Sequence, residues 1–360
     1  MKMRITVSIG IFAVMALSNA IVPVLPVYAH GSTWQGAIYA AYFLGAFLST
    51  LPGGIWSDRY GRVPVIRAGL ALTLLSGILL SLYTGPVIVI ILRCIEGLGA
   101  GFFVAAAMSY VNSLPDHEKM SGYFMAMLNV GLVLGLIAAG WLAVHLNLPV
   151  SGIILFTALT AITCGISLFI KESPLSRICS STGIFTVLLK DYRWLWYSSI
   201  ILVGITGVAT SLYPKFSGGS PDIVGIWIAG MSVATIIAVI ISSRIPLSPV
   251  ATLRWSAVLM TVAVIITFLS PLGFILIGAL AGVIMIAQMA FLSEVHDHQG
   301  LVMGLFSTSS YLGMTLLPVV AGFIADTAGF PAGFFFAAVC AVSVAITIGW
   351  CGCHVYHPAK

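Results

Sequence analysis

The sequence predicts an all-α, polytopic membrane protein with twelve transmembrane helices in two pseudo-symmetric bundles of six. Hydrophobic residues make up 60% of its 360 residues and charged residues only 7%, whereas a soluble domain carries about 25% charged residues. Apolar runs recur along the chain, and each is long enough to form the helix of about 20 residues that crosses a bilayer. A hydrophilic stretch at residues 171–193 divides these runs into two sets of six.

The N-terminal half, residues 1–170, holds the first six apolar runs. The first run follows a basic N-terminus and continues well past a candidate cleavage site at residues 18–20, so we interpret it as a retained helix and not as a cleaved signal peptide. We expect its two prolines, Pro23 and Pro26, to unwind or kink it. The fifth run exceeds one bilayer thickness, which indicates tilt or extra turns outside the membrane. The predicted spans are 5–26, 33–56, 65–84, 86–111, 121–146 and 148–170.

The C-terminal half, residues 194–360, follows the predicted cytoplasmic linker at 171–193 and holds six more apolar runs. The first of these begins with Trp194, Trp196 and Tyr197, where the aromatic belt of a membrane interface is expected. The eleventh run is again longer than one bilayer thickness. The predicted spans are 194–213, 221–243, 251–270, 271–293, 300–325 and 330–353.

The placement of lysine and arginine predicts the orientation of these spans. If the N-terminus is cytoplasmic and the spans alternate, only Lys215 falls outside and Arg93 lies within a span. This bias predicts a multi-pass protein of the cell membrane with both tails in the cytoplasm, and it explains the net charge of +5 without a nucleic-acid partner. The cations expected inside are Lys2, Arg4, Arg59, Arg62, Arg67, Lys119, Lys171, Arg177, Lys190, Arg193, Arg244, Arg254 and Lys360.

A faint internal repeat supports the division into two similar halves. Gly135 in the fifth span matches Gly313 in the eleventh at a shift of 178 residues, and Gly140 matches Gly322 at a shift of 182. Small residues are common in apolar helices, so chance matches are the competing explanation. Parallel repeats related by an axis along the membrane normal are one known plan for transporters.

The loop between the second and third spans carries the most specific local pattern. Residues 54–62 read GIWSDRYGR, a glycine followed by an Asp-Arg-x-Gly-Arg run. This pattern resembles the signature of the major facilitator superfamily of secondary transporters, and it lies in the same loop. The resemblance covers mainly the N-terminal half, because Ser242-Ser243-Arg244 occupies the corresponding loop of the second half. It implies two six-helix bundles around a central cavity that opens alternately to each side.

The resemblance also implies a conformational latch at this loop, formed by Gly54, Asp58, Arg59, Gly61 and Arg62. Gly54 and Asp58 share one helix face and would allow another helix to come close. The Asp58 carboxylate would accept hydrogen bonds from the free amides at the start of the eleventh span, and this contact would hold the cytoplasmic ends together in the outward-open state. Arg59 and Arg62 would pair with Asp116 or Glu118. The alternative explanation is that the charges of this tight turn only set the orientation of the helices in the membrane.

Two charges lie deep within the fourth predicted span. Arg93 and Glu96 are three residues apart, so they share a helix face. Intramembrane charges are costly to insert and are therefore functional candidates. The pattern of an arginine followed by Gly97, Gly99 and Gly101 resembles the fourth-helix motif of the same superfamily. We expect Glu96 to carry the coupled proton and Arg93 to modulate it. A structural ion pair that fixes helix packing is the alternative.

Several polar and aromatic residues within the spans are candidates for lining a substrate cavity. Each of them could equally be a packing residue. Two departures from the superfamily weaken a proton-antiport interpretation: Leu136 replaces the proline of the antiporter motif, and Asn19 is neutral where many proton-linked exporters carry an acid. The cavity candidates are Asn19, Tyr39, Tyr42, Asn129, Thr206, Thr210, Trp227, Gln288 and Tyr311.

The sequence therefore predicts a secondary transporter that works by alternating access, with a small molecule, a proton and the lipid bilayer as partners, and active as a monomer. The sparse charge favours proton-coupled efflux of an amphipathic or drug-like compound. The alternatives are an uptake symporter or uniporter of a metabolite, and a membrane sensor or assembly factor without transport. We predict no enzyme, since the sequence shows no catalytic triad or metal cluster, and no cofactor; the absence of a Walker A loop argues against direct ATP drive. We also predict no metal site, because the C-terminal Cys351, Cys353, His354 and His357 match no zinc spacing.

Overall fold

The computed structural model of the protein describes residues 2–114, 117–170, 189–245, 248–293 and 299–350. Every regular element within these ranges is a helix. Eleven of the described helices are long and apolar enough to cross a membrane, and a twelfth, shorter helix is also apolar. That helix has 17 residues, which is at the lower limit of what spans the hydrocarbon core. The twelve predicted spans are thus present as helices in the predicted order.

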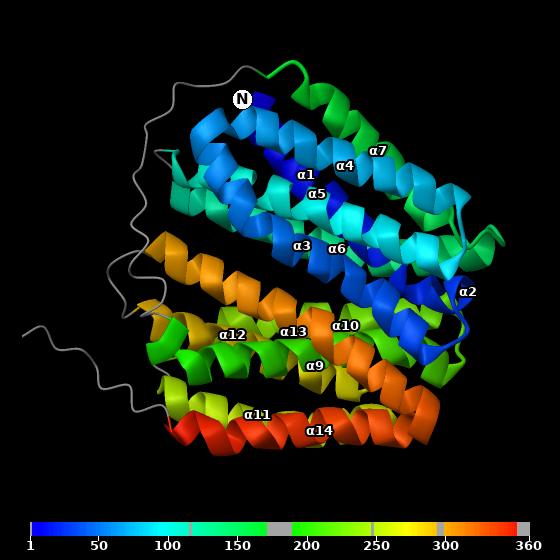
Figure 1. The fold of residues 1–360 in the computed structure, drawn as a ribbon, viewed down its shortest axis with the longest axis vertical. Helices are drawn as coiled ribbons and strands as arrows, with labels where there is room; N and C mark the ends of the chain where they lie inside the picture. The colour runs from blue at the N-terminus through cyan, green and yellow to red at the C-terminus, as the bar shows by residue number, and fades with distance from the viewer. Residues whose placement is uncertain (1, 115–116, 171–188, 246–247, 294–298, 351–360) are drawn as a thin grey trace, which may run out of the picture.

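The first six spans form one bundle, drawn in the upper part of Figure 1. The first predicted span is interrupted where Pro23 and Pro26 occur, because proline has no N–H to continue a helix. It comprises α1, a 3-10 turn η1 and the short α2. The elements are α1 (Lys2–Ala20), η1 (Val22–Val24), α2 (Leu25–Tyr28), α3 (Ser32–Tyr60), α4 (Arg62–Leu82), α5 (Pro86–Asn112), α6 (His117–His145) and α7 (Ser151–Ser167).

The last six spans form the second bundle, in the lower part of Figure 1. The predicted linker, 171–193, lies outside the described residues up to position 188, and α9 begins at its last residue. Helix α13 is the longest of this bundle, as the sequence predicts for the eleventh span. The elements are α9 (Arg193–Ser217), α10 (Pro221–Ser242), α11 (Pro249–Leu269), α12 (Gly273–Ser293), α13 (Gln299–Ala328), α14 (Phe330–Thr347) and η2 (Ile348–Trp350).

Equivalent contacts in the two bundles reveal the internal repeat. Gly135 on α6 packs against the carbonyl of Ala16 on α1, and its repeat mate Gly313 on α13 packs against the carbonyl of Ile200 on α9. Arg67 on α4 donates to the carbonyls of Ser167, Leu168 and Ile170 at the end of α7. In the second bundle, Arg254 on α11 donates to the carbonyl of Ala345 near the end of α14. Each bundle thus packs its fifth helix on its first and caps its last helix with an arginine of its third.

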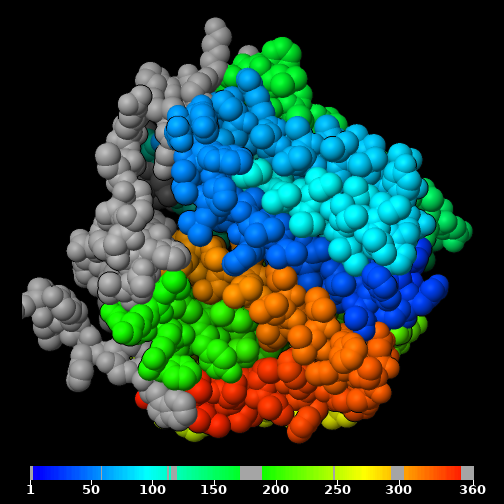
Figure 2. Space-filling view, in the orientation of Figure 1, coloured from blue at the N-terminus to red at the C-terminus, as the bar shows by residue number. Residues whose placement is uncertain are grey.

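Among the described residues, the two bundles touch closely at one of their two ends. We call the end where α13 finishes, near Asp326, the Asp326 end, and the opposite end, where α1, α4 and α9 begin, the linker end. At the Asp326 end α3 packs on α13 and α6 packs on α10, and Figure 2 shows the blue and orange surfaces of the first pair in contact. A Cβ on Gly322 would lie 2.6 Å from the Ser32 carbonyl oxygen, and one on Gly225 would meet the carbonyl of Leu136. Glycine permits this approach of one backbone to another.

The linker end is more open between the bundles. A Cβ added to Gly54 on α3 or Gly304 on α13 would meet no atom of the described residues within 4 Å. Both glycines lie near the ends of long helices that touch closely at the Asp326 end. The structure therefore has the form expected of one state of an alternating-access protein, closed at the Asp326 end.

Candidate transport site

A cavity of about 270 Å³ lies between the bundles, close to the lower limit of ligand pockets at about 300 Å³. One helix of the first bundle and four helices of the second bundle supply its walls. On α10, α12 and α13 its lining residues lie at or beyond the helix midpoint toward the linker end. None of the described residues that line it is charged. The lining residues are Asn129, Leu132, Leu202, Val203, Thr206, Met231, Ser232, Thr235, Ala281, Ile284, Met285, Gln288, Phe306 and Ser310.

Three of the nine predicted cavity residues line this cavity, namely Asn129, Thr206 and Gln288. The other six lie elsewhere in this state. Asn19 does not line the cavity but contacts a residue that does: its side-chain amide donates to the carbonyl of Leu132 over 3.2 Å. Thr210 is buried and donates to the Thr206 carbonyl. Tyr39, Tyr42, Trp227 and Tyr311 are also absent from the cavity wall.

The Gln288 side chain has a defined orientation beside the cavity. Its side-chain N–H donates to the Ser198 hydroxyl over 3.1 Å, and that hydroxyl donates to the carbonyl of Leu195. Because the hydroxyl proton is already used, Ser198 accepts from Gln288, and this identifies which Gln288 atom is the nitrogen. The remaining side-chain oxygen is buried and has no hydrogen-bond partner among the described residues. Such an oxygen is a ready acceptor for an N–H or O–H group of a ligand.

Apart from Thr206, the hydroxyl and thioether groups of the cavity were not predicted from the sequence. Met231, Ser232 and Thr235 line it from α10, and Ser310 lines it from α13. One usable signal was present on α12, where residues 281, 284, 285 and 288 recur at the three- and four-residue spacing of a single helix face. Starting from Gln288, that spacing identifies the whole α12 wall. The α10 and α13 walls have no comparable polar marker, so only the fold reveals them.

The predicted charge pair is formed on α5. The Arg93 guanidinium donates to one carboxylate oxygen of Glu96 over 2.7 Å, and both side chains are almost completely buried. The other Glu96 oxygen and the Arg93 Nε have no hydrogen-bond partner among the described residues. The guanidinium carbon lies 4.7 Å from the centre of the Tyr42 ring, a cation–π distance. The pair does not line the cavity, so in this state it contacts no bound solute there.

An aromatic cluster separates the Arg93–Glu96 pair from the second bundle. Phe43 of α3 contacts both Tyr39 and Tyr42 of the same helix, with ring centres 5.0 and 5.1 Å apart. The Phe43 ring lies 6.2 Å from that of Tyr311 on α13. The Tyr39 ring also packs on Gly207 of α9. In this state Tyr39 and Tyr311 therefore contribute to the contact between the bundles, whereas Tyr42 lies against Arg93 of its own bundle.

The predicted latch is only partly described. Gly61 joins α3 to α4 with φ 107°, a conformation that only glycine adopts easily. Arg62 donates to the hydroxyls of Ser109 and Ser113 at the end of α5. The Arg59 guanidinium carbon lies 5.4 Å from the centre of the ring of its neighbour Tyr60, and Arg59 is exposed. The side chains of Asp58 and Glu118, and all of Asp116, lie outside the described residues, as do Cys351, Cys353, His354 and His357.

Comparison with known families agrees with this geometry. The chain matches the family model of the Major Facilitator Superfamily over residues 7–295, and it belongs to this superfamily. It is a multi-pass membrane transporter of small molecules and not an enzyme.

Curated relatives and solved structures extend over nearly the whole chain. Multidrug resistance protein 2 of Bacillus subtilis is 26% identical, covering 95% of this chain and 93% of that protein. Multidrug resistance protein 1 of the same organism is also 26% identical and covers 97% of each chain. A D-xylose–proton symporter structure has a TM-score of 0.75 at 15% identity, covering 100% and 99% of the two chains. A bacterial homologue of the human lysosomal transporter Spinster has a TM-score of 0.77 at 13% identity, covering 97% and 95%.

Proposed function

We propose that this transporter exports amphipathic, drug-like small molecules from the cell in exchange for protons. The observation that carries the proposal is the separation of two sites. A cavity without charged residues lies mainly in the second bundle, and a buried carboxylate lies in the first. The names of the two Bacillus subtilis relatives, multidrug resistance proteins 1 and 2, support the same class of substrate.

The cavity wall favours a largely apolar solute that carries a hydrogen-bond donor. Apolar side chains of leucine, isoleucine, valine, alanine, methionine and phenylalanine supply most of the wall, and methionine adapts easily to ligands of different shape. The unpartnered oxygen of Gln288 would accept the donor of the solute. A polyanion would find no cation in this wall, and its desolvation would remain uncompensated.

Glu96 is the carboxylate that we assign to proton coupling. Its free oxygen is the atom on which a proton would bind. Protonation would end the ion pair with Arg93, and the released guanidinium would interact more strongly with the Tyr42 ring of α3. Gly97 and Gly45 bring the backbones of α5 and α3 into direct contact beside the pair. A change in the pair would therefore alter the packing of α5 on α3, and α3 is one of the helices that contact the second bundle.

We further propose that the linker end faces the cytoplasm and that this state is inward-open. Among the described residues, Arg4, Arg62, Arg193, Arg244 and Arg254 lie toward the linker end, whereas Lys215 lies at the Asp326 end. An excess of cations is typical of the cytoplasmic side. The Asp58 latch would then form only in the opposite, outward-open state, which agrees with the open space beside Gly54.

Transport by the purified protein in lipid vesicles tests the proposal. A fluorescent aromatic amine dye is the substrate probe, and an imposed pH gradient is the driving force. We expect Glu96→Gln to reduce gradient-driven dye accumulation to the level of empty vesicles while leaving dye-for-dye exchange within about twofold of wild type. Asp191→Asn, which removes an exposed carboxylate of the segment before α9, is the matched control and should change neither rate.

The other outcomes distinguish the alternatives. Accumulation by Glu96→Gln at the wild-type rate would remove Glu96 as the coupling residue. Accumulation in the same direction as the protons would indicate an uptake symporter. Exchange without any effect of the gradient would indicate a uniporter. Absence of dye binding and of flux for a panel of amphipathic compounds would contradict the export proposal and favour a sensor.

A further inference from the structure

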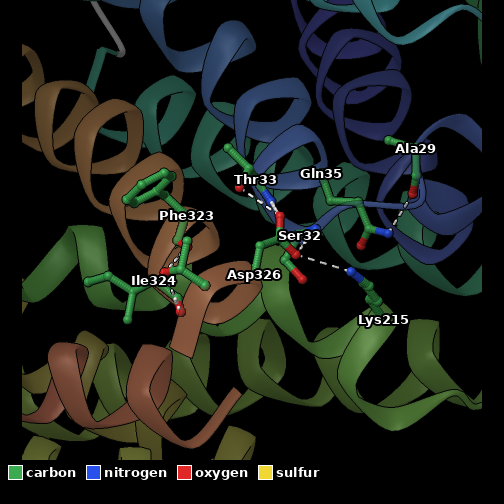
Figure 3. Close-up of polar contacts among 9 residues, drawn as sticks. Ala29, Ser32, Thr33, Gln35, Lys215, Phe323, Ile324 and Asp326 are labelled. Atoms are coloured by element: carbon green, nitrogen blue, oxygen red, sulfur yellow. Dashed lines mark hydrogen bonds and ion pairs between the residues drawn. The ribbon is translucent and has the colours of Figure 1, made fainter. Parts of the chain in front are cut away.

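A second carboxylate is placed where the bundles close. Asp326 lies two residues before the end of α13, and Figure 3 shows its side chain directed at the first residues of α3. One carboxylate oxygen accepts the Ser32 N–H over 2.8 Å. The other accepts both the N–H and the hydroxyl of Thr33, each over 2.7 Å. Lys215 of α9 donates to the first oxygen over 3.2 Å.

Each of these contacts is chemically favourable for a carboxylate. The first four amides of a helix have no partner within the helix, and Asp326 takes up two of those of α3. The positive end of the α3 dipole and the Lys215 ammonium both favour negative charge there. Asp326 is otherwise poorly placed, because it is close to the negative C-terminal end of its own helix. Its stabilisation therefore comes from the other bundle and from α9.

The backbone around this contact is built for close approach. A Cβ on Gly31 would lie 3.3 Å from an Asp326 carboxylate oxygen, and one on Gly322, a helical turn earlier, would lie 2.6 Å from the Ser32 carbonyl oxygen. Gly36, one turn further along α3, packs against the carbonyl of Pro318. The side-chain amide of Gln35 donates to the carbonyl of Ala29 over 2.7 Å and holds the turn before α3 in place. The start of α3 is thus fixed against α13.

We propose that Asp326 is a closing residue of the Asp326 end and that α3 and α13 form a two-ended latch. Asp58 also lies two residues before the end of its helix, α3. Each helix of this pair therefore carries a carboxylate two residues before its C-terminus. Asp326 contacts the N-terminus of α3 in the present state. In the other state Asp58 would contact the N-terminus of α13, which is the part of this inference that rests on the proposed function.

The two contacts exclude each other for a geometric reason. Helices α3 and α13 touch at the Asp326 end and separate toward the linker end, as Gly322 and Gly304 of the same helix illustrate. Rocking the bundles to close the linker end would draw Asp326 away from the amides of Ser32 and Thr33. The two carboxylates would thus shift the conformational equilibrium in opposite directions, and neither needs to touch the transported solute.

Spin-label distances in the full-length protein in lipid vesicles test this proposal. Labels at Tyr83→Cys and Leu272→Cys, two exposed positions that face the Asp326 end from the two bundles, report whether that end is closed. We expect Asp326→Asn to raise the ratio of separated to closed molecules about tenfold or more, because hydrogen bonds to a charged group are each worth about a factor of ten. Lys215→Met should raise it by less, about fivefold at most, since this ion pair is partly exposed.

Three further variants keep the test decisive. Asp222→Asn removes a carboxylate from the first turn of α10 at the same end and should leave the ratio within about twofold. Thr33→Val removes only the hydroxyl bond, keeps the backbone N–H and should give a smaller shift in the same direction as Asp326→Asn. Asp58→Asn should shift the ratio in the opposite direction.

The closing role of Asp326 is overturned if Asp326→Asn and Thr33→Val both give the wild-type distance distribution, or if Asp222→Asn shifts it equally. A shift with Asp326→Asn but none with Asp58→Asn would support the closing role and overturn the two-ended latch. That second result would also remove the proposed Asp58 latch, whereas the export proposal would stand or fall with the transport assay on Glu96→Gln.

Discussion

The two bundles share a fold but hold different kinds of buried polar group. The first bundle buries an ion pair, Arg93 with Glu96, whose members lie within one helix and face α3. The second bundle buries a neutral pair, Gln288 with Ser198, which joins α12 to α9 beside the cavity. A charge pair can respond to a proton, and a neutral amide can recognise a solute. The difference suggests that coupling and recognition belong to different halves of the protein.

Breaking the ion pair should produce the largest effect. Arg93→Met leaves the Glu96 carboxylate buried without its partner, and we expect the free energy of unfolding to fall by about 3–5 kcal/mol. The double variant Arg93→Met/Glu96→Leu removes both charges and should recover most of this loss, since apolar replacement of a buried pair is often neutral. Thermal unfolding in detergent measures both. Equal destabilisation of the single and double variants would contradict an energetic ion pair.

The boundary between the two bundles provides the next test. A side chain at Gly322 would collide with the backbone at Ser32, whereas one at Gly304 of the same helix would meet no described atom. We expect Gly322→Val to disfavour the closed Asp326 end by about 1–3 kcal/mol. The spin-label pair at positions 83 and 272 would then report separation. Gly304→Val, toward the linker end, is the matched control. If it separated the labels as much as Gly322→Val, the Asp326 end would not be the tightly packed end.

Removing Gln288 from the neutral pair should weaken recognition more than coupling. Gln288→Leu deletes the free oxygen at the cavity and should raise the dissociation constant for dyes with an N–H or O–H donor by about 5–30-fold, the equivalent of about 1–2 kcal/mol. Dyes without a donor should bind almost as well as to the wild type. Thr210→Val, a buried hydroxyl outside the cavity wall, is the control. Fluorescence titration gives the constants, and equal losses for both dye types would contradict direct recognition.

The smallest expected effect concerns a hydroxyl of the same cavity. Ser232 lines the cavity from α10, and its neighbour Thr235 already donates to the carbonyls of Met231 and Gly278. Ser232→Ala should therefore change dye affinity by about fivefold or less, since a single neutral hydrogen bond contributes about 1 kcal/mol after exchange with water. A loss as large as that of Gln288→Leu would place the main contact of the solute on α10 and not on α12.

Local patterns predicted much of this molecule from the sequence. The charge-poor composition and the apolar runs indicated every span, and the spacing of Arg93 and Glu96 placed both on one helix face, where the structure confirms a direct bond. The prolines at positions 23 and 26 marked the interruption of the first span. Each of these signals lies within a few residues of the feature that it predicts.

Features that depend on tertiary packing were not predictable in this way. The Asp326 contact joins residues 293 and 294 positions apart, and neither Ser32 nor Thr33 carries a local sign of it. Lys215 stood out in the sequence only as an exception to the charge bias. The tyrosines at positions 39 and 42 were expected to face a solute, yet Tyr39 packs on Gly207 of α9 and Tyr42 lies against Arg93 of α5 in this state. Whether they face a cavity depends on the conformational state.

Photolabelling tests the separation of recognition from coupling most directly. An aromatic amine dye that carries a photoreactive azide would be bound to the full-length protein in lipid vesicles, irradiated and located by mass spectrometry. The account predicts adducts on the cavity walls of α6, α9, α10, α12 and α13, lost when unmodified dye competes and reduced in Gln288→Leu but not in Glu96→Gln. Adducts concentrated on α5 around Arg93 would contradict it.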